Sequence, residues 1–234
     1  MATVHSHEFL DDPRFKAAYS RGLQAIGTSD DYEWHWRIHV GLWAASLASK
    51  LEGDFVECGV NKGFLSSAIM QYLQWDRLQK TFYLLDTFNG VDERHLTPEE
   101  IAAGAQEKNA ANLRSGFYCG DILGVRKNFA EWENVLIIQG SIPDSLQSVH
   151  ATRVAYLHID MNCAPPEVAA LEFFWDKLVP GAVVLLDDYA YFGFRNQKLA
   201  MDEFASRVGI QICSLPTGQG LLFKPPSHVA TQQA

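Results

Sequence analysis

The sequence lacks the features that mark several large classes of protein. Its 234 residues carry 19 basic and 28 acidic side chains, a formal net charge of −9. Nucleic-acid binders need clustered lysine and arginine to neutralise phosphates, so this acidic balance argues against them. No apolar run reaches the ~18 to 20 residues that span a bilayer, and the first residues have neither the basic nor the apolar segment of a signal peptide. We therefore expect a cytoplasmic protein that binds neither nucleic acid nor membranes.

Cysteine is scarce and scattered, and internal repeats and low-complexity tracts are missing. Cys58, Cys119, Cys163 and Cys213 form no C-x-x-C pair. Four distant cysteines in a chain of this length predict buried thiols in a reducing compartment rather than a zinc site or a disulfide framework. Apolar residues make up 47% of the chain, which is enough for one sizeable core.

What the sequence does have is an alternation of short apolar runs with helical segments. The runs are apolar at nearly every position, as in strands that helices bury on both faces of a parallel sheet. The predicted strands cover residues 54–58, 81–86, 135–139, 154–160 and 182–187, and the predicted helices between them cover residues 62–74, 121–132, 164–178 and 195–208. This order predicts an α/β fold with a doubly wound, mostly parallel, Rossmann-like sheet. Residues 210–214 and 221–224, around a glycine-rich turn, predict a closing antiparallel C-terminal hairpin.

The remaining segments are assigned around this sheet. Residues 1–52 predict an N-terminal helical cap, whose first thirty residues either pack loosely or serve as a cap. Residues 53–224 predict the sheet domain itself. Within that domain, residues 87–120 form a connection long enough to predict a lid over a binding site. Its T-P-E-E segment at residues 97–100 has the pattern of a helix N-terminus and predicts one helix to about residue 113. Residues 225–234 predict a flexible tail.

Acidic side chains stand at the ends of four of the five predicted strands. Glu57 belongs to the first strand, Asp86 to the second, Asp160 to the fourth and Asp187 to the fifth, with Asp188 next to it. Parallel strands direct their carboxyl ends to one edge of the sheet, where ligands bind in α/β proteins. We therefore expect these carboxylates along a single rim, although any one of them could serve only as a helix cap or turn former.

The turn after the first predicted strand favours a particular kind of ligand. It has the spacing E-x-G-x-x-x-G, with Glu57, Gly59 and Gly63, and lacks the third glycine of a dinucleotide-binding turn. Glu57 would repel a phosphate and attract an ammonium group, whereas Asp86 stands where an acidic residue accepts hydrogen bonds from ribose hydroxyls. A ligand with an ammonium group, a ribose and no phosphate is S-adenosylmethionine.

Asp160, Asp187 and Asp188 form a second group of carboxylates. Converging carboxylate oxygens suit a hard divalent cation such as Mg²⁺, and without one such groups raise each other's pKa. A metal site is the favoured interpretation, while a metal-free general base and capping without chemistry stay open. His158 alternates onto the side of Asp160 and is either a hydrogen-bonded core histidine or a group that takes part in catalysis.

Several segments carry a family resemblance. VECGVNKG, LLDTFNG, HIDMN and LVPGAVVLLDDY resemble class I S-adenosylmethionine-dependent methyltransferases, and in particular the macrocin O-methyltransferase family, over about residues 53–204. That family methylates sugar hydroxyls of natural-product glycosides. Asn162 departs from the family pattern, because members often have a second aspartate at this position, two residues after the first.

The resemblance implies a role for each candidate residue. The cofactor would be held at its methionine moiety, ribose and adenine by Glu57, Gly59, Gly63, Asp86, Thr87, Phe88, Ser141, Ile142 and Asp160. The implied Mg²⁺ ligands are Asp160, Asp187 and Asp188, and the catalytic base is Asp160, with His158 as the second choice.

The expected function is an S-adenosylmethionine-dependent, Mg²⁺-dependent O-methyltransferase. It would act on a small-molecule hydroxyl, such as that of a natural-product sugar or vicinal diol, because a metal that grips two oxygens favours adjacent hydroxyls. The resemblance and the apolar N-terminal helix also favour a homodimer. A nicotinamide-dependent oxidoreductase, a metal-dependent hydrolase and a non-catalytic nucleotide-binding domain of the same fold stay as alternatives.

Overall fold

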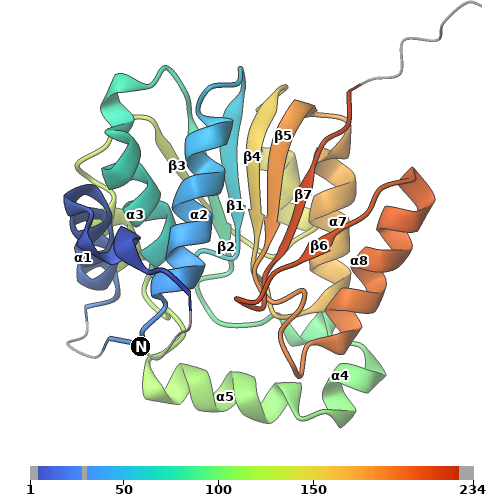
Figure 1. Cartoon of the computed structure of the whole chain (residues 1–234). Coiled ribbons are helices and arrows are strands. Elements are labelled where there is room, and N and C mark those ends of the chain that lie inside the picture. Colours follow the sequence, from blue (N-terminus) through green and yellow to red (C-terminus); the bar gives the residue numbers. More distant parts are fainter. Residues whose placement is uncertain (1–4, 28–30, 227–234) are drawn as a thin grey trace, which may run out of the picture.

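The computed structural model describes residues 5–27 and 31–226 (Figure 1). The predicted flexible tail lies outside the described residues except for Pro225 and Pro226. Among the described residues, no helix combines the length and the apolar character that crossing a membrane requires.

One mixed sheet of seven strands organises the described part of the chain. The strands are β1 (Asp54–Cys58), β2 (Phe82–Asp86), β3 (Val135–Gln139), β4 (Val154–Ile159), β5 (Leu178–Leu186), β6 (Cys213–Ser214) and β7 (Gly220–Phe223). They lie in the order β3-β2-β1-β4-β5-β7-β6. The first five are parallel, and β7 runs antiparallel to both of its neighbours. The predicted doubly wound sheet and the closing hairpin are therefore confirmed.

The strand order places a crevice between β1 and β4. The chain moves outward from β1 through β2 to β3, and then returns to the other side of β1 to form β4 and β5. Connections leave the two central strands in opposite directions, so their carboxyl ends border the crevice in which open α/β sheets bind ligands. Topology alone thus directs the ends of β1, β2, β4 and β5 toward one region.

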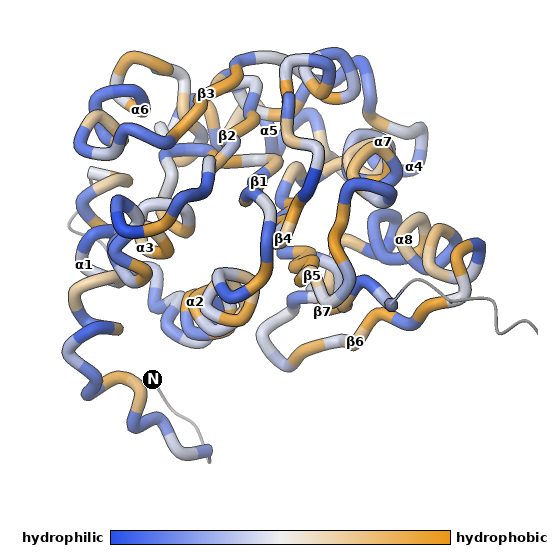
Figure 2. The backbone as a smooth tube through the Cα atoms, turned by 90° about the horizontal axis from the view of Figure 1, so that it is seen from above, coloured by the Kyte–Doolittle hydropathy of each residue, from blue (hydrophilic) through white to orange (hydrophobic). Residues whose placement is uncertain are grey.

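Helices cover both faces of the sheet (Figure 2). One face carries α1 (Pro13–Ile26), α2 (His35–Ala48) and α3 (Phe64–Leu73), and the other carries α7 (Ala164–Trp175) and α8 (Arg195–Val208). Three further helices precede β3, namely α4 (Pro98–Ala102), α5 (Ala105–Ser115) and α6 (Ile122–Asn128). Short 3₁₀ helices lie at Glu8–Asp11, Trp75–Arg77, Glu93–His95 and Asp144–Ser148. Two-sided coverage explains why the parallel strands are apolar at almost every position.

An aromatic cluster fills the core near the start of the central strands. Phe55 packs edge-on against Trp75 and Phe82 at ring-centroid distances of 5.2 and 5.7 Å, and lies 5.1 Å from Tyr156. All four side chains are fully buried. Each such side chain contributes about 1.5 to 3 kcal/mol of transfer free energy, so the end of the sheet opposite the crevice anchors the fold.

Two predictions about local structure are wrong, and one of the two alternatives for the N-terminal segment is excluded. The helix predicted from residue 97 to about 113 is two helices, because Gly104 adopts a left-handed φ of 85° between α4 and α5. The N-terminal segment is not loosely packed, since α1 lies against α3 and buries Phe15 and Tyr19. Cys213 is exposed on the short edge strand β6, whereas the other three cysteines are buried as predicted. All four are free thiols.

Gly59 provides a test of how tightly the two central strands meet. It has a φ of 91°, and a Cβ there would lie 1.7 Å from the Asp160 carbonyl oxygen. We expect Gly59→Ala to lose more than about 3 kcal/mol of unfolding free energy, because neither backbone can yield without opening the β1–β4 junction. Gly209→Ala is the matched control, with a φ of 71° and nothing within 4 Å. It should cost only about 1 kcal/mol.

Urea denaturation of both variants measures the difference. Equal, small losses for the two substitutions would show that the β1–β4 junction is loose and would contradict the close approach described here.

Candidate active site

A cavity of about 1000 Å³ lies along the carboxyl ends of the parallel strands. It is lined by the turns that follow β1, β2, β3, β4 and β5 and by the start of α2. The connection of residues 87–120, called the insertion below, also contributes through α5 and residues 115–119. Glu57, Asp86, Asp160, Asp187 and Asp188 all contribute to its wall. The structure therefore brings the five strand-end carboxylates to one cavity, which is large enough for a nucleotide and a second small molecule.

The other candidate residues divide into two groups. Gly59, Thr87, Ser141 and Ile142 line the same cavity, as do His158 and Asn162. Gly63 does not line it, because the position of its missing Cβ faces the ring of Phe129 at 2.5 Å. Phe88 is buried and borders a neighbouring hollow of about 780 Å³ instead.

Asp86 organises the turn after β1. Its Oδ2 accepts hydrogen bonds from the backbone N–H groups of Val60 and Asn61, both at 2.7 Å, and its Oδ1 accepts from Phe88 N at 2.6 Å. Burial raises the pKa of Asp86, and these backbone donors oppose the rise. Because much of its accepting capacity serves the backbone, Asp86 shapes two loops of the cavity, whatever ligand it also meets.

Asn61 joins this turn to the insertion and was missed in the sequence. Its Nδ2 donates to Phe117 O at 3.0 Å, and its Oδ1 accepts from Cys119 N at 2.7 Å. Asn61 has a φ of 53°, a conformation that asparagine tolerates better than most residues. Its place within a glycine-rich turn was the available signal.

His158 is held between two carboxylates. Its Nδ1 lies 2.9 Å from Glu57 Oε1, and its Nε2 lies 3.6 Å from Asp187 Oδ1, longer than an ordinary hydrogen bond. His158 and Glu57 are 2% and 3% exposed. Burial alone would lower the pKa of His158, but Asp187 and Glu57 outweigh it and raise the pKa to about 10. The two carboxylates therefore favour the protonated form of the imidazole.

Arg37 provides the second cation and was not predicted as a site residue. From α2 it reaches across the cavity to Asp187 Oδ2 and to Asp188 Oδ1, the latter at 3.1 Å. Burial alone would raise the pKa of Asp187, but Arg37 and His158 lower it. Burial and the charge of Asp187 instead raise the pKa of Asp188 to about 6.

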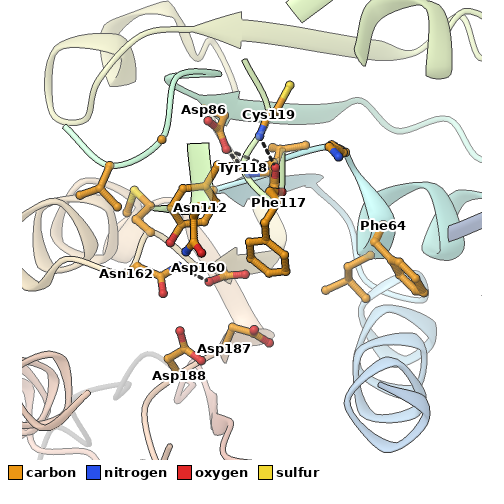
Figure 3. A pocket seen from close by; sticks show the side chains of 18 of the residues that line it. Phe64, Asp86, Asn112, Phe117, Tyr118, Cys119, Asp160, Asn162, Asp187 and Asp188 are labelled. Atoms are coloured by element: carbon orange, nitrogen blue, oxygen red, sulfur yellow. Dashed lines mark hydrogen bonds between the residues drawn. The ribbon is translucent and has the colours of Figure 1, made fainter. Parts of the chain in front are cut away.

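Among the residues that the structure describes, no cationic side chain lies within hydrogen-bonding distance of Asp160. Its Oδ1 accepts from the amide of Asn162 at 3.3 Å, and Figure 3 shows it facing Asp187 and Asp188 across the cavity. Burial, together with those two carboxylates, raises the pKa of Asp160 well above its usual range. A carboxylate with a raised pKa binds a proton more readily, as a general base requires.

The three aspartates do not fit the Mg²⁺ site that the resemblance implied. Both oxygens of Asp187 have nitrogen partners, since Gln219 Nε2 donates to Oδ1 at 3.0 Å and Arg37 contacts Oδ2. Arg37 also takes one oxygen of Asp188. In the described part of the chain, no group of three or more acidic, histidine or cysteine side chains is arranged to hold a metal ion.

The insertion is anchored over the start of α7. Thr97 and Glu100 form a reciprocal capping box at the start of α4, in which Glu100 Oε2 accepts from Thr97 N at 2.8 Å. The second oxygen, Oε1, accepts from Ala164 N at 2.8 Å and so caps α7 as well. From this anchor the chain continues into α5, which lies below the sheet in Figure 1. Lys108 and Asn112 of α5 contribute to the wall of the cavity.

Comparisons with known proteins identify the family. The model of the family described as Macrocin-O-methyltransferase (TylF) matches residues 42–213. The chain therefore belongs to the macrocin O-methyltransferase family.

Two curated relatives match a large part of the chain. The first, 8-demethyl-8-(2,3-dimethoxy-alpha-L-rhamnosyl)-tetracenomycin-C 4'-O-methyltransferase of Streptomyces olivaceus, is 25% identical over 169 residues, which cover 70% of this chain and 62% of the relative. The second, Mycinamicin III 3''-O-methyltransferase of Micromonospora griseorubida, is 24% identical over 178 residues, which cover 71% and 65%. The match thus spans less than two thirds of either relative.

A solved structure shows the same fold. The O-methyltransferase NovP superimposes with a TM-score of 0.66 and 21% identity, covering 82% of this chain and 80% of that chain. This likeness confirms the Rossmann-like fold with its antiparallel C-terminal strands.

Glu167 offers a pH test of the turn that carries Asp160. It is buried at the start of α7, and its Oε1 accepts from Met161 N at 3.2 Å. Burial, together with Asp188, raises its pKa well above the ordinary value of 4.5. A carboxyl whose pKa is raised by folding contributes stability at low pH and loses it as the pH rises. The unfolding free energy should therefore fall over the measured range from about pH 4.5 to neutral pH.

Glu167→Gln keeps the acceptor oxygen and removes the buried charge, so its stability should exceed that of the wild type at the upper end of this range and match it at the lower end. Urea denaturation across the range measures this, with the exposed Glu133→Gln as the control. Parallel pH profiles for the wild type and Glu167→Gln would show that Glu167 is not buried as a charge.

Proposed function

We propose that the protein transfers a methyl group from S-adenosylmethionine to a hydroxyl oxygen of a small molecule, with a natural-product sugar as the acceptor class. Family membership supports this proposal, as do two relatives named as O-methyltransferases of a rhamnosylated tetracenomycin and of mycinamicin III. The observation that carries it is the acidic cavity at the crevice between β1 and β4.

The charge of this cavity favours a cationic cofactor. Glu57, Asp160, Asp187 and Asp188 lie in its wall, and only Arg37 and His158 oppose them there as close ion-pair partners within the described residues. The remaining negative charge attracts the sulfonium and ammonium groups of S-adenosylmethionine and repels the pyrophosphate of a nicotinamide dinucleotide. The oxidoreductase alternative is therefore disfavoured by electrostatics as well as by the missing third glycine.

The cofactor would extend along the turns after β1, β2 and β3. We assign its methionine moiety to Glu57 and Gly59, its ribose to Asp86 and the adjoining Thr87, and its adenine to Ser141 and Ile142, all of which line the cavity. Gly63 and Phe88 support these turns from behind, because neither lines the cavity itself. Residues 53–224 would then form the cofactor-binding domain.

The acceptor would occupy the part of the cavity next to Asp160. Residues 1–52 and the insertion of residues 87–120 supply walls there, through the start of α2 and through α5. We propose the insertion as a lid, anchored at Glu100. The expected homodimer stays a prediction.

Methyl transfer requires an in-line attack of the hydroxyl oxygen on the sulfonium methyl group. Holding the two reactants together supplies much of the rate acceleration. Asp160 accepts the proton, since it faces the cavity and has no cationic hydrogen-bond partner in the described part of the chain. His158 cannot serve as the base while both of its nitrogens carry protons, so its role is to hold Glu57 and Asp187 in place.

No step is assigned to Mg²⁺, because the oxygens that would bind it are paired with Arg37 and Gln219. The magnesium requirement expected from the sequence stays a prediction that chelation can test.

Isothermal titration calorimetry tests the cofactor. We expect a saturable heat of binding with S-adenosylmethionine and none with NADH, because of the charge of the cavity. Binding of NADH without binding of S-adenosylmethionine would refute the proposed function, and binding without turnover on any glycoside or diol would support the non-catalytic alternative.

The role of Asp160 is tested by Asp160→Asn. We expect kcat to fall by a factor of about 100 or more, because the amide cannot accept the proton. Binding of S-adenosylmethionine, measured by calorimetry, should persist, because Glu57, Asp187 and Asp188 keep the cavity acidic. Asp176→Asn, an exposed aspartate at the far end of α7, is the matched control. Wild-type kcat in Asp160→Asn would remove Asp160 as the base.

A further inference from the structure

Arg37 stands where helix electrostatics disfavour a cation. It is the third residue of α2, next to the positive end of the helix dipole. Its side chain is only 18% exposed, and a buried arginine requires partners for its charge and donors. The reason for its position therefore lies outside its own helix.

Its partners belong to the end of β5 and to the turn before β7. One guanidinium nitrogen, Nη2, contacts both the carboxylate and the carbonyl of Asp187, the carbonyl at 2.7 Å, and donates to Asp188 Oδ1 at 3.1 Å. The other, Nη1, donates to Thr217 O at 3.4 Å. The ring of Tyr191 lies 5.7 Å from the guanidinium carbon. The guanidinium therefore bridges two adjacent carboxylates and also donates to the carbonyl oxygens of Asp187 and Thr217.

This arrangement competes with a divalent cation for the same oxygens. Mg²⁺ binds oxygens at about 2.0 to 2.1 Å in a near-octahedral shell. To bind Asp187 and Asp188, it would have to displace Arg37 or accept a fixed positive charge beside it. A guanidinium keeps its charge at any working pH and matches carboxylate geometry. It therefore neutralises the charge of these aspartates throughout that pH range.

We propose that Arg37 is a built-in substitute for a divalent cation, which pairs Asp187 and Asp188 and leaves Asp160 free of metal. In this arrangement the site does not bind Mg²⁺ in the wild-type protein. Arg37 acts as a positioning residue, because it fixes the two carboxylates opposite Asp160. It does not itself accept the proton of the hydroxyl group. The consequence for catalysis rests on the proposed methyl transfer, whereas metal binding can be measured without any turnover.

Electron paramagnetic resonance of Mn²⁺ provides the test, because bound and free Mn²⁺ give separable signals. We expect the wild type to show no saturable binding tighter than about 1 mM. Arg37→Met, which removes the charge and keeps much of the length, should bind one equivalent at least about tenfold more tightly. Mg²⁺ should displace that ion, and Mn²⁺ should raise the melting temperature of Arg37→Met but not of the wild type.

Three further proteins locate the gained site. Arg37→Gln is a second neutral variant, in case Arg37→Met does not fold. Arg37→Lys retains a positive charge and should bind Mn²⁺ as weakly as the wild type. Adding Asp188→Asn to the neutral variant should abolish the gained binding, since it removes one of the two carboxylates that the loss of Arg37 leaves without a cation.

Two results would overturn the proposal that Arg37 takes the place of a divalent cation. One is saturable binding of one Mn²⁺ equivalent by the wild type that Mg²⁺ displaces and Asp187→Asn removes. The other is an absence of binding in the neutral variants as well as in the wild type, because the aspartates would then form no cation site for Arg37 to occupy. Calorimetry with S-adenosylmethionine on the same wild-type sample tests the proposed function separately, since its failure leaves the Mn²⁺ result intact.

Discussion

The crowding of negative charge at the ends of β1, β4 and β5 is the constraint on which the site depends. Glu57 and Asp187 flank His158, and Asp187 acts on the nearby Asp160, in a largely buried region where unpaired like charges are costly. Two cations relieve this cost: His158 lies within the sheet, and Arg37 reaches in from α2. The N-terminal helices are therefore more than a cover over the sheet. Without α2 the carboxylates at the end of β5 would lose their main counter-charge.

Much of the fold could be predicted because its strands are buried on both faces. Uninterrupted apolar runs gave the bounds of β1 and β3, and periodic spacing gave those of α8. The errors arose where local sequence conflicts with tertiary structure. Gly104 lies inside an otherwise helical pattern and ends α4. The start of β5, at Leu178, was missed because Pro180 and Gly181 look like a turn, yet both are exposed in the strand.

The candidate site was predictable to the extent that topology determines it. Parallel strands end at the same edge of the sheet, so the carboxylates at their ends were expected to lie near one another. All of them line the cavity. Partners across the chain were not predictable. The contact of Arg37 with Asp187 links residues 150 positions apart, and no local pattern announces it. Likewise, the backbone donors that occupy Asp86 come from a turn whose shape depends on the φ values of Gly59 and Asn61.

The double hydrogen bond of Asn61 has a consequence for how acceptor preference can change. Its side chain clamps the segment after α5, while its own N–H is held by Asp86. Under the proposed function, the wall next to the acceptor would thus take its position from the turn next to the cofactor. Diversification toward new acceptors would then proceed by exchanging individual side chains on α5, such as Lys108 or Asn112, with the backbone of the wall conserved as a fixed frame.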